Sequence, residues 1–192
     1  MARAMSSSET TLLKDRQEDP DSADGSQPGG TAPLLRAVAL QRPADELVQL
    51  VAMLNEADQS DYAQQILDTT ATLRTVEDFA AVVPKVGSPQ AVHALRLAAA
   101  QRPVAELAEL AALLFGNGQS GYAREVLNTT AAERPVEDIA AMVPLLVDDQ
   151  AANALHSAAA QRPVAELAEL VGHLYGTPDT LPAGQGRWKL RR

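Results

Sequence analysis

"QRPVAELAEL" occupies residues 101–110, and the same ten residues return unchanged at 161–170. A third version, "QRPADELVQL", stands at 41–50. The copies are sixty residues apart, and residues 41–100 align with 101–160 without a gap, with 31 of the 60 positions identical. A recurrence at this period predicts stacked supersecondary units, each of which buries its apolar face only against its neighbours.

The repeated stretch has the pattern of an amphipathic helix. Leu107, Leu110, Ala111 and Leu114 recur at i, i+3, i+4 and i+7, and Pro103 suits the first helical position. Aromatic residues make up only 3% of the chain, which favours close helix packing over a β-sandwich or barrel. We therefore expect an all-α fold, an α-solenoid of antiparallel helix pairs.

Each sixty-residue unit divides into sub-units of 32 and 28 residues, because "ERPVEDIAAMVPLL" at 133 echoes "QRPVAELAELAALL" at 101. Proline, threonine and glycine mark helix ends. These helix-end signals predict about ten helices: a short one near 33–40, four in each unit, and a last one at 163–175.

The expected domain organisation is a helical repeat domain between two disordered tails. Residues 1–32 are rich in Ser, Asp, Gly and Pro and lack apolar spacing, which predicts disorder. The domain covers residues 33–176, with units 41–100 and 101–160 and a partial unit 161–176. Residues 177–192 form the second tail, with a basic end.

Composition restricts the class of protein. The chain has no cysteine, which excludes disulfides and thiolate metal sites. It shows neither a secretory signal nor a long apolar run, so we expect a cytoplasmic protein. Arginine outnumbers lysine thirteen to three, and this bias and the alanine content suggest a GC-rich bacterial genome such as an actinobacterium's.

The stretch "LLFGNGQSGYAREVLNTTAAERP" resembles the tetratricopeptide and pentatricopeptide helical repeats over about 140 residues of the chain. The residues that carry the resemblance are Gly118, Tyr122, Ala123, Val126, Leu127, Ala131 and Pro135, with Tyr62, Ala63, Ile66, Leu67 and Ala71 in the earlier copy. The resemblance implies either a peptide-binding groove or an RNA-reading surface.

No catalytic, cofactor or metal site is expected. The histidines, His93, His156 and His173, occupy different repeat positions and do not predict a shared metal ion. The carboxylate pairs Glu77–Asp78, Glu137–Asp138 and Asp148–Asp149 stand at predicted helix starts, where carboxylates stabilise the helix dipole. "GNGQSG" joins two predicted helices, which favours a turn over a phosphate-binding loop.

Five arginines precede predicted helix starts, at positions 42, 74, 102, 134 and 162. Two readings stay open: a ladder that faces an acidic partner, with Arg42, Arg102 and Arg162 as binding residues, or arginines that pair with carboxylates in their own turns. Residues 33–176 hold nine basic and eighteen acidic residues, which disfavours nucleic acid.

The last copy of the decapeptide predicts an open apolar face. Leu167, Leu170, Val171 and Leu174 repeat the stripe, but no partner helix is predicted after it. We expect a non-enzymatic interaction or scaffold protein, whose partner is an unidentified protein or a second copy, with Trp188 and Leu190 as a possible lid. The alternative is a nucleic-acid-binding repeat protein of the pentatricopeptide type.

Overall fold

The computed structural model describes residues 30–176, and this part of the chain is all-helical. Its ten α-helices are α1 Thr31–Gln41, α2 Ala44–Glu56, α3 Ser60–Leu73, α4 Val76–Val82, α5 Ser88–Gln101, α6 Val104–Gly116, α7 Ser120–Glu133, α8 Val136–Met142, α9 Asp148–Gln161 and α10 Val164–Tyr175. The predicted all-α class and the number of helices are confirmed.

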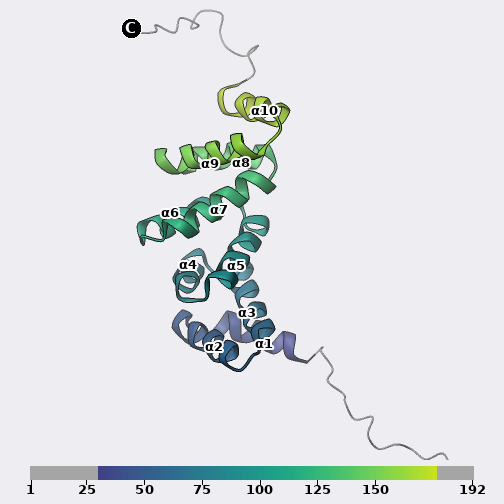
Figure 1. Cartoon of the computed structure of the whole chain (residues 1–192), viewed down its shortest axis with the longest axis vertical. Helices are drawn as coiled ribbons and strands as arrows, with labels where there is room; N and C mark the ends of the chain where they lie inside the picture. The colour runs from purple at the N-terminus through teal and green to yellow at the C-terminus, as the bar shows by residue number, and fades with distance from the viewer. Residues whose placement is uncertain (1–29, 177–192) are drawn as a thin grey trace, which may run out of the picture.

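The helices form two layers that run along the long axis of the molecule (Figure 1). The odd-numbered helices pack on one another in chain order, from α1 to α9. The even-numbered helices do the same from α2 to α10. We call an odd helix and the even helix that follows it in the chain one helix pair, so that each pair stacks on the pair before it. Between the two layers, the most extensive contacts join α2 to α3 and α6 to α7.

The Arg-Pro dipeptides separate the two helices of a pair. A residue before proline is disfavoured in the helical conformation, and Arg102 accordingly has an extended ψ of 151°. Pro103 follows with a ψ of 148°, and its carbonyl accepts the first hydrogen bond of α6, from the Leu107 nitrogen at 3.1 Å. Pro103 was predicted to be the first helical residue, but it is the N-cap, and α6 begins one residue later, at Val104.

Other turns follow their local sequence. Gly118 has a φ of +74°, and the aligned Asp58 has a φ of +58°, so both turns that lead into α3 and α7 use the left-handed region. Pro84 and Pro144 lie in single 3₁₀ turns after α4 and α8. These prolines end the α-helices, as predicted.

The helix bounds differ from the predicted ones by a few residues. The first helix begins at Thr31, two residues before the predicted start of the domain at 33. The last begins at Val164, because Pro163 is its N-cap. The predicted tails, apart from their residues at 30–32, lie outside the described residues.

The core consists mainly of alanine, leucine and valine. One buried cluster runs from Ala39 to Ala154. A smaller one, at the C-terminal end, holds Ala131, Val136, Ile139, Ala158 and Leu170. Phe79 is buried completely. Small side chains allow the helices to approach closely, in keeping with the low aromatic content.

We expect Thr75→Ala to lower the free energy of unfolding by about 1 kcal/mol, measured by urea denaturation. Thr75 is the N-cap of α4, and its hydroxyl accepts a hydrogen bond from the Asp78 nitrogen at 3.3 Å. Thr75→Pro is the matched control, because Pro135 stands at the aligned position with a similar backbone conformation. An alanine variant as stable as the parent would contradict the role of the Thr75 hydroxyl as a cap, whereas the proline variant reports only the effect of backbone restriction.

Candidate interaction surface

Five arginines end the odd helices, and four of them, Arg74, Arg102, Arg134 and Arg162, link successive helix pairs. Arg102 shows the pattern: its Nε donates to the Ala71 carbonyl at 2.5 Å, and its Nη2 donates to the Arg74 carbonyl at 2.7 Å. Both carbonyls lie at the end of the preceding odd helix, α3. Its Nη1 binds Glu106 Oε2 at 2.8 Å. One guanidinium therefore joins two helix pairs and one carboxylate.

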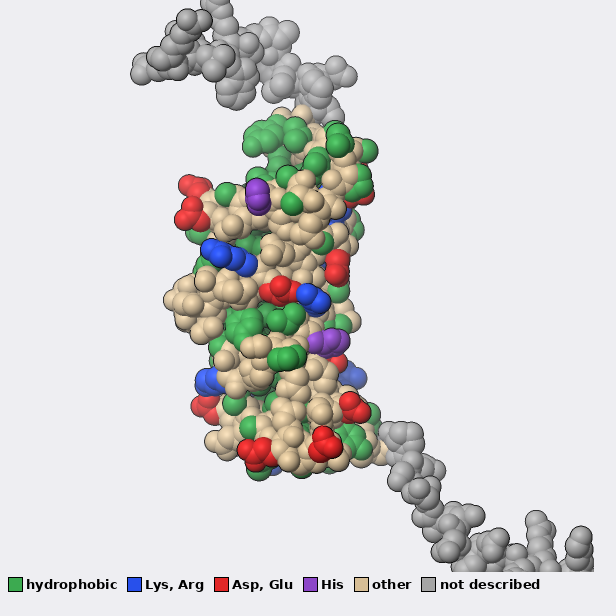
Figure 2. All heavy atoms as spheres, viewed as in Figure 1, with side chains coloured by type: hydrophobic (Ala, Val, Ile, Leu, Met, Phe, Trp, Pro, Cys, Tyr) green, Lys and Arg blue, Asp and Glu red, His purple; other side chains and the backbone are tan. Residues whose placement is uncertain are grey.

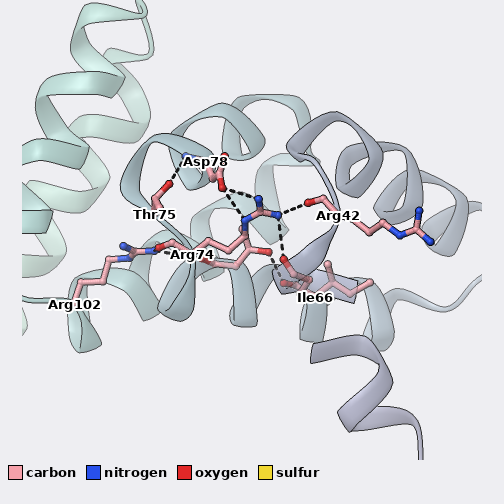
Figure 3. A network of polar contacts seen from close by, with 8 residues as sticks. Arg42, Ile66, Arg74, Thr75, Asp78 and Arg102 are labelled. Carbon is pink, nitrogen blue, oxygen red and sulfur yellow. Dashed lines mark hydrogen bonds and ion pairs between the residues drawn. The ribbon is translucent and has the colours of Figure 1, made fainter. Parts of the chain in front are cut away.

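The same arrangement recurs at the other ladder positions, and Figure 3 shows it for Arg74, which binds Asp78 and the Arg42 carbonyl. Arg74 donates to the carbonyls of Ala39 and Arg42. Arg134 donates to those of Ala100 and Arg102. Arg162 donates to the carbonyls of Ala131 and Arg134 and pairs with Glu166. We call these residues, Arg42, Arg74, Arg102, Arg134 and Arg162, the arginine ladder.

The arginine ladder supplies hydrogen-bond donors to the C-terminal carbonyls of the odd helices. The last carbonyls of a helix have no partner within it and carry the negative end of its dipole. A guanidinium supplies both a positive charge and several donors in one plane. The Arg102 side chain is only 2% exposed, and its Cζ lies 5.5 Å from the Phe79 ring centroid. The ladder therefore holds consecutive pairs together.

The reading that each arginine pairs with a carboxylate in its own turn is confirmed. Each ladder arginine pairs with an acidic residue four positions later, namely Glu46, Asp78, Glu106, Asp138 or Glu166. The reach to the preceding helix was not predicted. Its signal in the sequence is an arginine at every odd helix end, at the alternating spacings of 32 and 28 residues.

The predicted partner-binding arginines differ in accessibility. Arg42 has a side chain that is 62% exposed, whereas those of Arg102 and Arg162 are 2% and 9% exposed. The guanidinium groups of Arg102 and Arg162 are occupied by carbonyls and glutamates. Among these three, only Arg42 has a side chain that is mostly exposed.

The stripe of α10 is partly uncovered. Leu170 is 4% exposed, and it packs in the small C-terminal cluster, where Leu167 and Leu174 are half-buried. Val171 is 55% exposed, whereas the aligned Ala111 of α6 is completely buried. The difference arises because α7 packs on α6, and no described helix follows α10.

The uncovered part of α10 joins a larger apolar surface (Figure 2). Val164 and Tyr175 of α10 are 82% and 73% exposed. A shallow hollow of about 360 Å³ lies between α8, α9 and α10, and its lining is Ala140, Val143, Pro144, Leu155, His173, Leu174 and Tyr175. The remaining predicted contact residue, Trp188, lies outside the described residues.

Titratable groups form no buried cluster in the described range. His93 lies 3.7 Å from Asp68, on the exposed surface. His173 lies 3.9 Å from Glu169, and with Glu137 the two offer ligand atoms within 4.8 Å of one another, all on exposed residues. The carboxylate pairs at 77–78, 137–138 and 148–149 lie in the first turns of α4, α8 and α9, as predicted.

One ion pair on the surface changes the pKa of a carboxyl group. Lys85 Nζ donates to Asp45 Oδ1 at 2.6 Å, and this hydrogen bond, with the Coulomb attraction, lowers the pKa of the Asp45 carboxyl. The pair joins the 3₁₀ turn after α4 to the first turn of α2. Because both side chains are exposed, the pair adds little to stability.

The described helices are each too short or too polar to cross a membrane. "GNGQSG" forms the turn between α6 and α7, as predicted. No protein-family model, curated protein sequence or solved structure matches this chain.

Proposed function

We propose that this chain is a non-enzymatic protein-interaction module, an α-solenoid that binds another protein through its C-terminal end. The observation that carries the proposal is the exposure of Val171. The residue at this stripe position is 1% exposed in α2, as Val51, and completely buried in α6, as Ala111, but 55% exposed in α10. A position that is buried in the earlier repeats is therefore exposed in α10, the last helix of the described residues.

Exposed aliphatic surface of this kind favours protein association. Val164, Val171 and Tyr175 lie on one helix, and Tyr175 also lines the hollow, whose other lining residues are apolar except for His173. Contiguous apolar surface at the end of a helical repeat array usually requires either a polar cap or a partner. The resemblance to tetratricopeptide repeats, which bind peptides, supports the same class of function.

The charge distribution supports a protein ligand over nucleic acid. The described residues hold nine basic and eighteen acidic residues, and five of the nine basic ones belong to the arginine ladder. Four of those five donate to backbone carbonyls. Few cations remain to contact a phosphate backbone, and such contacts dominate the affinity for nucleic acid.

Site-specific photo-crosslinking tests the proposal. A benzophenone amino acid at position 171, introduced in the native host, is expected to crosslink a protein at the open end. The control position is 73, because Leu73 of α3 is similarly exposed, at 50%, and lies far from α10. Equal crosslinking from positions 171 and 73, or none from 171, would show that this end is not a binding surface.

We also expect weak retention of single-stranded RNA in a filter-binding assay at physiological salt. Net negative charge on the helical domain repels phosphates, so any binding is expected to stay near the non-specific level. Tight binding that falls steeply with added salt would instead favour the pentatricopeptide-type alternative.

A further inference from the structure

The two ends of the arginine ladder are complementary. In Arg102 and Arg162, Nη1 binds the glutamate four residues later, while Nε and Nη2 donate to carbonyls of the preceding helix. Arg42 makes the first contact, from Nη1 to Glu46 Oε2 at 3.1 Å. Its Nε and Nη2 have no acceptor among the described residues. The ladder therefore starts with unused donors.

The other end of the ladder has unused acceptors. At α1, α3 and α7, the carbonyl of the terminal arginine and the carbonyl three residues before it accept hydrogen bonds from the next ladder arginine. At α9 these two carbonyls belong to Arg162 and Ala159. No side chain in the described range donates a hydrogen bond to either carbonyl. The helical partner of the Ala159 carbonyl would be the N–H of residue 163, but Pro163 has none.

Apolar residues accompany the unused polar groups at both ends. Leu34 of α1 is 64% exposed, whereas the aligned Ala94 and Ala154 are completely buried against a preceding helix pair. At the opposite end, Val171 is 55% exposed. At these two positions, Leu34 and Val171, neither end has the polar residue that a capping repeat carries. We call α1 with Arg42 the head, and the outer face of α9 and α10 the tail.

We propose that the head of one copy of this chain binds the tail of another. Arg42 Nε and Nη2 then donate to the Ala159 and Arg162 carbonyls of the next copy, and Leu34 packs near Val171. This inference rests on the proposed function, since it names the partner of the open C-terminal end.

Hydrogen-bond complementarity favours this pairing over a symmetric dimer. Two tails bring together carbonyls without a donor, and two heads bring together two guanidinium groups. A head and a tail supply one donor set and one acceptor set. The α9 end suits this role because the aligned ends of α1 and α5 already accept Arg74 and Arg134. A head-to-tail contact is heterologous, so copies add without closing a dimer.

Sedimentation velocity on the full chain tests the proposal, with two variants that block one end each. The head variant is Leu34→Glu with Arg42→Ala, and the tail variant is Val164→Glu with Val171→Glu. The parent is expected to grow beyond the dimer as concentration rises, and each variant alone to stay monomeric. An equimolar mixture is expected to form a one-to-one complex, because one intact head and one intact tail remain.

Two controls separate the interface from general surface effects. Arg124→Ala removes an exposed arginine from α7, and Leu73→Glu adds a charge at an exposed leucine of α3. Both are expected to associate as the parent does. Arg42→Ala alone is expected to weaken association by roughly tenfold or more, since it removes only charge-assisted hydrogen bonds. Circular dichroism confirms that each variant is folded.

Several results would overturn the inference. If the parent is monomeric at every concentration, the head-to-tail inference is wrong. It is also wrong if the assembly stops at two copies. A head variant that associates like the parent points to tail-to-tail pairing. A crosslink from position 171 only to a different protein overturns the inference but leaves the proposed function intact, whereas no specific crosslink from 171 overturns both.

Discussion

Arg102→Ala is expected to lower the free energy of unfolding by about 3–5 kcal/mol, because it leaves buried hydrogen-bonding groups without partners. The Ala71 and Arg74 carbonyls lose their donor, and Phe79 loses the guanidinium beside its ring. Urea denaturation followed by far-ultraviolet circular dichroism measures the loss. The stack is expected to weaken most between the second and third helix pairs.

Arg42→Ala is the matched control for this prediction. Arg42 stands at the same repeat position and also pairs with a glutamate, but its side chain is 62% exposed and reaches no preceding helix. Its loss is expected to cost less than about 1 kcal/mol in a monomeric sample. Arg102→Met keeps apolar volume and should still be clearly destabilised, by about 2 kcal/mol. Equal losses at positions 42 and 102 would show that the carbonyl contacts add no stability.

Leu110→Asp is expected to cost about 4 kcal/mol or more and to abolish cooperative melting. The Leu110 side chain is completely buried in the stripe of α6, so the carboxylate would lie in the core without a partner. Thermal denaturation followed by circular dichroism checks the result. A variant that melts like the parent would contradict the packing of α6.

Val171→Asp is the control for this core substitution. Val171 lies on the corresponding stripe of α10 and is 55% exposed, so a carboxylate there stays in water. We expect a change within about 1 kcal/mol. The comparison separates burial from helix propensity, since both substitutions place aspartate inside a helix.

Much of the secondary structure follows from local chemistry. Proline restricts both itself and the residue before it, so each Arg-Pro dipeptide ends one helix and starts another wherever it occurs. Thr75 supplies a cap where proline is missing. Ala and Leu spacing shows which face of α6 is buried. The errors are confined to helix ends, where Pro103 proves to be a cap and α1 begins at Thr31.

The candidate site was only partly predictable. The open stripe of α10 follows from the repeat alone, because the partner helix of the earlier units is not predicted after it. The burial of Arg102 does not follow, since arginine next to a carboxylate four residues later is typical of an exposed ion pair. Only contact between α3 and α5 brings the carbonyls of one helix end to the arginine of the next.

The sequence by itself determined the all-helical class, the helix order and the apolar face of each helix, because these depend on contacts within a few residues. The tertiary structure alone decided which polar groups are satisfied. Arg102 and Arg42 have nearly the same local sequence, yet one is buried among carbonyls and the other is exposed. The physical reason is stacking: a guanidinium loses water and gains acceptors only where another helix end lies within hydrogen-bonding distance.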